Sequence, residues 1–267
     1  MKKLILGLDG MDFDIAVDLN LKNVLQVQFG RIEVPISEIL GRPYSPEVWA
    51  SFLCGERVKK VFAGRKRIWL LKYLVKLKKL FPFISLGLGK KASGQIVGFP
   101  ELDRETWVDL PNVKEFNSPY YSYTNEVFKY AKQFGEDNDL DNFRNGVSEI
   151  YEKNTKKIIS AVKLEIASPE CDLLFAYLHF PDMFNHLWYQ DKDVLFSLYL
   201  DIDDFVETVL NMLKKNLHVI IISDHGFDFK VNDHSDLGFI SSNKFMNFPK
   251  NIVGLGKLMY EYAGANK

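Results

Sequence analysis

Short apolar runs alternate with amphipathic stretches over most of the chain. Runs typical of buried strands lie at Lys3–Leu8, Leu173–Leu178 and His218–Ile222, and residues 193–215 repeat apolar side chains at helical spacing between the last two. A strand, a helix and a strand in this order predict a right-handed parallel crossover. We therefore expect an α/β fold, a three-layer sandwich around a mostly parallel central sheet.

Weaker patterns place the elements around these strands. Ile32–Ile36 predicts a short or edge strand, because Pro35 has no N–H to donate to a sheet. Residues 100–124 contain scattered Pro, Asp and Asn and predict a loop with one short strand. Apolar residues recur at helical spacing over 145–166, which predicts a further helix of the sandwich.

The segment SPEVWASFLCG predicts a helix of two to three turns. Ser45 precedes Pro46 as an N-cap precedes the first helical residue, and Gly55 closes the segment. Ser45 is then either an ordinary N-cap or a nucleophile, because a helix N-terminus also attracts anionic phosphoryl groups.

The composition is that of a globular protein. The 267 residues are 47% hydrophobic and 26% charged with a net charge of −1, which excludes disordered, collagen-like and disulfide-framework proteins. The two cysteines, Cys54 and Cys171, form no CxxC motif, and the N-terminal apolar run is too short for a signal peptide. No apolar run is long enough to span a membrane. We expect a cytoplasmic protein in which residues 1–267 form a single domain.

One segment differs in charge from the rest. Twelve Lys and Arg residues lie between Arg57 and Lys91, and residues 57–100 contain no Asp or Glu. We expect 57–100 to be a basic amphipathic helical insert within the domain. The insert could cover the core with its lysines extended into water, cap a site and hold an anionic substrate, or contact an anionic membrane through 65–84. No nucleic-acid module accompanies the charge, so nucleic acid is not an expected partner.

Polar residues gather where the three apolar strands end. A carboxylate follows each strand, and a histidine lies near two of these three carboxylates. One more histidine lies in the loop after the third strand. Because the carboxyl ends of parallel strands meet at one edge of a sheet, the topology should bring these residues together. They are Asp9, Asp182, His186, Asp224, His225 and His234.

Carboxylates and imidazoles together indicate a site for divalent metal ions. The set suits Zn²⁺, Mn²⁺ or Fe²⁺, and the absence of thiolates argues against a purely structural zinc site. Six ligands are too many for one tetrahedral ion with an open position. Two ions about 3.5 to 4 Å apart would use all six, in the arrangement that promotes phosphoryl transfer. We expect two divalent ions, with Zn²⁺ preferred and Mn²⁺ as the alternative.

Each of these residues also has a structural interpretation. Asp9 and Asp224 could be N-caps after buried strands, and Asp182 with His186 could form a surface pair. Other polar residues nearby are interpreted as structural. The remaining histidines are expected to be core or edge residues. The carboxylates around His234 are expected to be solvated, although two of them could accept a hydrogen bond that supports a ligand. These polar residues are His179, His218, Asp228, and the two possible supporting carboxylates, Asp233 and Asp236.

Four motifs in a fixed order carry a family resemblance. LGLDG, SPEVWASFLCG, PDMFNH and SDHGF each lie at an expected strand end or helix start. Together they resemble the alkaline phosphatase superfamily, and most closely its type I phosphodiesterase/nucleotide pyrophosphatase branch. The resemblance implies an alkaline-phosphatase-like fold, to which the basic insert is an addition.

The resemblance also implies a role for each candidate residue. Ser45 matches the nucleophile, which forms a covalent phospho-enzyme intermediate in family members. The ligands of a first ion, which also contacts the nucleophile, match Asp9, Asp224 and His225. The ligands of a second ion match Asp182, His186 and His234.

One contact of the family is absent from this sequence. Nucleotide pyrophosphatases carry an Asn beyond the glycine that closes the nucleophile helix, where it binds a phosphoryl oxygen. No Asn occurs between positions 57 and 100 here. Basic residues take this place and are the candidates for contact with the substrate: Arg57, Lys59, Lys60, Arg65, Lys66 and Arg67.

The expected function is metal-dependent hydrolysis of phosphate esters through a Ser45 phospho-enzyme, with a small phosphorylated molecule as the substrate. Phosphomonoester hydrolysis, phosphonate hydrolysis and phosphosugar mutase-type transfer would use the same site. The non-enzymatic alternative is a module that binds metal and phosphate without turnover, and the complete ligand set argues against it. The sequence makes no prediction of oligomeric state.

Overall fold

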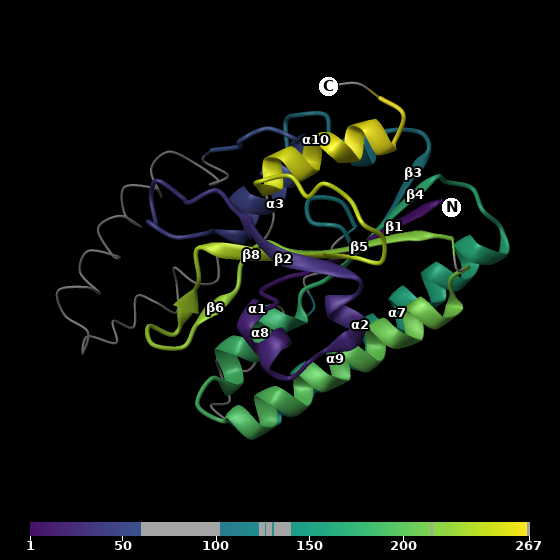
Figure 1. Ribbon diagram of the computed structural model, residues 1–267. Coiled ribbons are helices and arrows are strands. Elements are labelled where there is room, and N and C mark those ends of the chain that lie inside the picture. Colours follow the sequence, from purple (N-terminus) through teal and green to yellow (C-terminus); the bar gives the residue numbers. More distant parts are fainter. Residues whose placement is uncertain (60–101, 123–125, 127–129, 131–139, 215, 266–267) are drawn as a thin grey trace.

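The computed structural model describes residues 1–59, 102–122, 126, 130, 140–214 and 216–265. Its centre is a six-stranded sheet in the order β2-β8-β5-β1-β4-β3 (Figure 1). The strands are β1 (Lys3–Leu8), β2 (Gln28–Glu33), β3 (Val113–Phe116), β4 (Leu173–Leu178), β5 (His218–Ser223) and β8 (Leu237–Ser242). Strands β3, β4, β1 and β5 are parallel, whereas β8 and β2 pair in antiparallel fashion at one side. The expected mostly parallel sheet is confirmed.

The three strands predicted from apolar runs lie side by side at the centre. β1 pairs with β4 from Lys3 opposite Leu173, and with β5 from Lys3 opposite His218. Almost every residue of these three strands is buried. Strands covered on both faces have no solvent side, which explains why their apolar runs are continuous rather than alternating.

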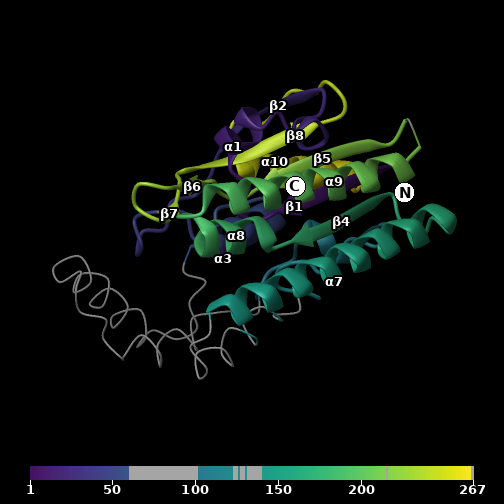
Figure 2. The ribbon, with the colours of Figure 1, turned by 90° about the horizontal axis from the view of Figure 1, so that it is seen from below.

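Helices cover both faces of the sheet and complete the three layers (Figures 1 and 2). One face packs against α1 (Phe13–Asp18), α2 (Lys22–Leu25), α7 (Leu140–Ala167), α8 (Phe180–Trp188) and α9 (Lys192–Met212). The other packs against α3 (Ser45–Cys54), the short 3₁₀ helix η1 (Trp107–Asp109) and α10 (Ile252–Tyr262). Side chains of β1 alternate between the two layers, with Leu4 and Leu6 in the first and Ile5 in the second.

The edge strand differs from its prediction. Sequence places it at Ile32–Ile36, but β2 spans Gln28–Glu33 and pairs with β8 at the edge of the sheet. The chain leaves the sheet before Pro35, which cannot donate to the ladder, and Ile36 forms an isolated bridge with Pro43. The edge position is confirmed and the bounds are wrong.

Helix α3 begins at Ser45 itself. Tyr44 is the N-cap and makes no side-chain capping bond, and Pro46 lies in the first turn. Gly55 ends the helix with a φ of 62°, in the left-handed region that favours glycine. The predicted helix with Ser45 at its N-terminus and Gly55 at its end is confirmed. Of the two interpretations of Ser45, the N-cap one is excluded, because Tyr44 is the N-cap.

Most of the basic insert lies outside the described residues. Only Arg57, Val58 and Lys59 of the 57–100 segment are described, so its helical character and the single-domain organisation stay predictions. Within the part of the chain that the structure describes, no helix is both long and apolar enough to cross a membrane.

Glu165 fastens the end of α7 to the neighbouring strands. Its carboxylate accepts the N–H of Glu170 (2.6 Å) and of Cys171 (2.9 Å), and it pairs with Lys114 at 3.1 Å. Burial would raise the pKa of Glu165, but these N–H groups and Lys114 lower it to about 2. The folded state therefore stabilises the charged form of this side chain.

We expect Glu165→Gln to lower the free energy of unfolding by about 1–3 kcal/mol at neutral pH. Because the folded-state pKa is depressed, the wild-type advantage exists above the ordinary pKa of 4.5 and disappears as pH falls toward 2. Urea unfolding of both proteins from pH 7 to pH 2 measures this difference. Glu152→Gln, which breaks an exposed pair with Lys156, is the control and should change stability by less than about 0.5 kcal/mol. A Glu165→Gln deficit that is constant across this pH range would contradict the prediction.

Candidate metal centre and nucleophile

The site lies at the carboxyl ends of the three central strands. Asp9 follows β1, Asp224 and His225 follow β5, and Asp182 lies in the first turn of α8, which follows β4. The N–H of Asp9 donates to Leu178 O at 3.0 Å, and the carbonyl of Asp9 accepts the N–H of Asp182 at 2.8 Å. Asp9 and Asp224 are 0% exposed and Asp182 is 7% exposed. The sheet thus gathers three buried carboxylates at one edge.

His225 is central to a first group of side chains. Its Nε2 lies 3.0 Å from Ser45 Oγ, 3.4 Å from Asp9 Oδ1 and 3.5 Å from Asp224 Oδ2. Ser45 Oγ is also 3.5 Å from Asp9 Oδ1. The residues predicted around the first ion therefore face one another, and the hydroxyl of Ser45 points into their midst.

Asp182 is central to a second group. Its Oδ1 lies 3.3 Å from His186 Nε2 and 3.5 Å from His234 Nε2, and the two Nε2 atoms are 3.3 Å apart. His186 belongs to α8, whereas His234 belongs to β7 (Asp233–His234), which pairs with β6 (Phe227–Asp228) in a short hairpin. Asp182 Oδ1 also lies 3.9 Å from His225 Nε2, so the two groups adjoin.

The oxygen atoms of both groups fit a cation site. Among the described residues, Asp182 Oδ1 and Asp224 Oδ2 are buried and accept no hydrogen bond, which is costly unless something else satisfies them. In each of two sets of residues, the potential ligand atoms lie within 4.8 Å of one another. One set comprises Asp9, Asp182 and His225, and the other comprises Asp182, His186 and His234.

Two of the imidazoles are oriented as metal ligands usually are. His225 Nδ1 lies 2.9 Å from Gly226 O, and His234 Nδ1 lies 3.2 Å from Pro43 O. A carbonyl can only accept a hydrogen bond, so each Nδ1 carries a proton and donates it. Each Nε2 is then the atom that faces the carboxylates, the arrangement in which a backbone carbonyl orients a metal-binding histidine.

The charges of the site favour a positive group at its centre. Burial and the charge of Asp9 raise the pKa of Asp224. Burial alone would lower the pKa of His225, but Asp224, Asp9 and Asp182 raise it to about 10. Burial and the nearby His225 lower the pKa of His234 to about 3. The carboxylates around His225 thus favour positive charge at its Nε2, which a proton or a divalent cation would supply.

Three residues that sequence reasoning did not assign hold the second oxygen of Asp9. Its Oδ2 accepts hydrogen bonds from the Tyr177 hydroxyl and from Trp49 Nε1 (3.2 Å), and lies 3.2 Å from His179 Nδ1. Asp9 Oδ1 is thereby left toward Ser45. His179, interpreted from sequence as a core or edge residue, is buried and also serves this site. Spacing could have identified all three: Tyr177 and His179 are two apart at the end of a strand, and Trp49 is one helical turn after Ser45.

The structure describes two of the six basic residues predicted to contact the substrate. Arg57 donates to Ile36 O at 3.0 Å, and Lys59 pairs with Glu38 at 2.6 Å. The start of the insert is therefore fastened to the loop that leads to Ser45. The other four, Lys60, Arg65, Lys66 and Arg67, lie outside the described residues.

Arg42 is a basic residue of the site that sequence reasoning missed. It pairs with Asp233, the neighbour of His234. Burial lowers the pKa of Arg42, and the charge of Asp182 opposes this effect, so the guanidinium lies in the field of that carboxylate. Asp233, proposed from sequence as a solvated or supporting carboxylate, holds this cation.

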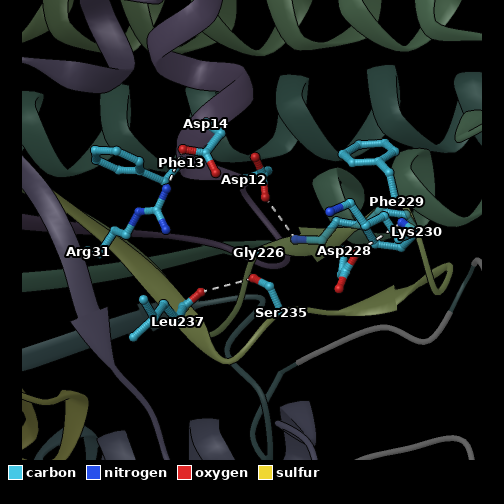
Figure 3. A pocket seen from close by; sticks show the side chains of 11 residues that line it. Asp12, Phe13, Asp14, Arg31, Gly226, Asp228, Phe229, Lys230, Ser235 and Leu237 are labelled. Carbon is cyan, nitrogen blue, oxygen red and sulfur yellow. Dashed lines mark hydrogen bonds and ion pairs between the residues drawn. The ribbon is translucent and has the colours of Figure 1, made fainter.

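A separate pocket of about 320 Å³ lies between α1, β2 and the β6–β7 hairpin (Figure 3). Its lining includes Asp12, Phe13, Arg31, Gly226 and Lys230 but none of the candidate metal ligands. A dashed line in Figure 3 marks the hydrogen bond between Asp12 Oδ2 and the N–H of Phe227, at 2.9 Å. The pocket is thus a neighbour of the site rather than part of it.

Comparisons with known proteins identify the family and the fold. A family model, type I phosphodiesterase / nucleotide pyrophosphatase, matches residues 91–242. A search among curated proteins found no match. The alkaline phosphatase of the Antarctic bacterium TAB5 is similar in structure, with a TM-score of 0.54 and 14% identity over 100% of this chain and 98% of that chain. A histidine-to-aspartate mutant of the TAB5 enzyme with Mg bound in its M3 site has a TM-score of 0.55 and 14% identity over 100% of this chain and 99% of that chain. Murine ectonucleotide pyrophosphatase/phosphodiesterase 5 with AMP has a TM-score of 0.46 and 15% identity, over 85% of this chain and 57% of that chain. The predicted alkaline-phosphatase-like fold is confirmed.

Proposed function

The chain belongs to the type I phosphodiesterase/nucleotide pyrophosphatase family, whose members are hydrolases of phosphoric esters, and we propose that it cleaves small phosphodiesters with Ser45 as the nucleophile and two divalent ions as cofactors. One observation carries this proposal. Ser45 Oγ, in the first turn of α3, lies 3.0 Å from His225 Nε2 within a set of buried carboxylates and imidazoles. Two oxygens of that set, Asp182 Oδ1 and Asp224 Oδ2, accept no hydrogen bond from the described residues.

The proposed ligands follow the two groups of side chains. Asp9, Asp224 and His225 would hold the first ion beside Ser45. The second ion would be held by Asp182, His186 and His234. Carboxylate and imidazole donors support Zn²⁺ as the preferred ion and Mn²⁺ as the alternative. The ions would neutralise the charge of the phosphoryl group and favour the alkoxide of the Ser45 hydroxyl.

The chain itself positions the nucleophile and the phosphoryl group. Ser45 Oγ would lose its proton and form a bond to phosphorus as the bond to the leaving oxygen breaks on the opposite side, and the departing alkoxide would take up a proton to leave as the alcohol. The positive end of the α3 dipole, at the same helix terminus, would favour the anionic phosphoryl group. In a second step, water would attack the phosphoryl group on Ser45, which still carries the other alkyl group, release a phosphomonoester and regenerate the Ser45 hydroxyl. Tyr177, Trp49 and His179, which contact Asp9 Oδ2, would hold Asp9 in position as a ligand of the first ion.

Basic residues near Ser45 are proposed to contact the substrate. Arg42 is the best-supported candidate, because it lies in the field of Asp182 and beside the His234 hairpin. Arg57 and Lys59 would act mainly by fastening the loop that leads to Ser45. Lys60, Arg65, Lys66 and Arg67 stay sequence-based candidates.

The wider role of the basic insert also stays a proposal from sequence. Residues 57–100 would cap the site and hold an anionic substrate, and contact of 65–84 with an anionic membrane is the alternative. The cytoplasmic location is proposed on the same sequence grounds.

A substrate panel tests the proposed reaction. The metal-free protein is reconstituted with Zn²⁺ or Mn²⁺ and assayed on bis(p-nitrophenyl) phosphate, p-nitrophenyl phosphate and a p-nitrophenyl phosphonate. We expect turnover with ions, none without them, and the highest kcat/KM on the diester. A preference for the monoester or phosphonate would replace the phosphodiesterase assignment by one of those activities. No turnover on any substrate with either ion would favour the non-catalytic binding module.

A further inference from the structure

The loop after β1 connects the two candidate ligand groups through its backbone. Gly10 N–H donates to Asp224 Oδ1 at 3.2 Å, and Met11 N–H donates to Ser223 Oγ at 2.8 Å. Gly10 has a φ of 69°, and a Cβ built on it would lie 2.6 Å from the Cα of Asp182. The loop is therefore in direct backbone contact with the elements that carry both groups.

Asn185 binds this loop from α8. It lies three residues after Asp182 and directly before His186, and it is 0% exposed. Its Nδ2 donates to Gly10 O at 2.7 Å. Because Gly10 O can only accept, the amide orientation is unambiguous, and Oδ1 points to the other side. The bond fixes the rotation of α8 about its axis, and hence the directions of Asp182 and His186.

Tyr199 of α9 joins Asn185 to Asp12. Its hydroxyl donates to Asn185 Oδ1 at 2.9 Å and accepts the N–H of Asp12 at 3.2 Å. Tyr199 is 0% exposed and Asp12 is 6% exposed. Each donor in this series of hydrogen bonds meets an acceptor, so the network has one hydrogen-bonding arrangement.

Asp12 extends the network to the loop after β5. Its Oδ1 accepts the N–H of Ile15, and its Oδ2 accepts the N–H of Phe227 at 2.9 Å, as Figure 3 shows. Phe227 follows His225 by two residues, and its ring contacts the ring of His186 edge-on at 5.1 Å. A Cβ on Gly226 would lie 2.7 Å from Asp12 Oδ2, so the loop passes close to this carboxylate.

We propose that Asn185, Tyr199 and Asp12 are positioning residues that set the separation and orientation of the two ligand groups. The inference rests on the proposed metal site but concerns residues outside the candidate ligand set. The network joins the loop of Asp9, the helix of Asp182 and His186, and the loop of His225. Without it, each group could shift relative to the other while the sheet stayed intact.

Metal binding tests the inference without an activity assay. The metal-free full chain is titrated with Co²⁺ by calorimetry, and the visible absorption of bound Co²⁺ reports the ligand geometry. Tyr199→Phe removes one oxygen atom, and Asn185→Leu removes both hydrogen bonds of the amide. We expect each variant to bind at least one ion 10- to 100-fold more weakly, the range typical for residues that orient metal ligands, with an altered Co²⁺ spectrum.

Tyr260→Phe is the matched control. Its hydroxyl donates to Glu105 O at 3.1 Å on the other face of the sheet, and the residue is buried. The control should lose some thermal stability and keep the wild-type affinity and spectrum. Wild-type affinity and spectrum in Tyr199→Phe would overturn the inference, even if Asn185→Leu does not fold. A wild-type protein that binds no Co²⁺ would instead overturn the proposed metal site.

Discussion

Ser45→Ala is expected to lower kcat on the preferred ester by at least about 1,000-fold, because removal of a nucleophile leaves only the contribution of binding and electrostatics. The six candidate metal ligands stay in place in this variant. Metal affinity should therefore change far less than turnover. Steady-state kinetics and Co²⁺ titration of the same preparation measure both quantities.

Ser51→Ala is the control for this variant. Ser51 lies on the same helix, is buried, and donates to Glu47 O at 2.6 Å while accepting the N–H of Val58 at 3.0 Å. Its loss should reduce stability without a comparable loss of turnover. Ser45→Ala activity within tenfold of the wild type would contradict the nucleophile assignment and favour direct attack by water.

The second large effect concerns stability. We expect removal of divalent ions by chelation to lower the Tm of the wild type by about 10 °C or more. An ion at 1,000 times its Kd adds about 4 kcal/mol to the free energy of unfolding, and about 1 kcal/mol shifts the Tm of a chain of this size by about 2–4 °C. Differential scanning calorimetry with Zn²⁺ and with EDTA measures the shift.

Asp224→Asn should lose most of the increase in Tm that Zn²⁺ gives over the metal-free protein. Its metal-free form should be at least as stable as the metal-free wild type. Burial and the charge of Asp9 raise the pKa of Asp224, so its charge opposes folding unless a cation is bound. Asn keeps the shape and removes the charge.

Asp236→Asn is the control for Asp224→Asn, because it changes an exposed carboxylate of the following loop. Asp236→Asn should keep the full increase in Tm with Zn²⁺. The same full increase in Asp224→Asn would exclude Asp224 as a ligand. A marked loss of stability in metal-free Asp224→Asn would show that the charge of Asp224 is already satisfied within the protein.

Much of the fold follows from local pattern. The apolar runs located β1, β4 and β5 to within one residue, because strands buried on both faces exclude polar side chains. The pattern failed at the edge, where burial of β2 alternates but Phe29 is on the exposed side and Gln28 and Gly30 are on the more buried side. It did not indicate β8 or α10. At Ser45 the sequence was ambiguous, since Ser before Pro suits an N-cap equally well.

The site was predictable where chemistry and topology coincide. The carboxyl ends of parallel strands in one sheet meet at one edge, so Asp9, Asp182 and Asp224 could be grouped from the sequence alone. Arg42 and Asn185 could not be found in this way. Arg42 depends on a contact with Asp233, and Asn185 depends on contacts with Gly10 and with Tyr199 of another helix. No local pattern encodes the proximity of these segments.

The sequence by itself determined the central strands, the carboxylates and histidines at their ends, and the family resemblance that assigned Ser45 its expected role. These features are local, because strand burial and residue type are properties of short segments. Only the tertiary structure decided that the Ser45 hydroxyl faces His225 instead of capping its helix and that Asp9 shares one oxygen among three donors. It also decided that Tyr199 hydrogen-bonds with both Asn185 and the backbone of Asp12. Each of these depends on distances between segments, which are set by how helices and strands pack around the sheet.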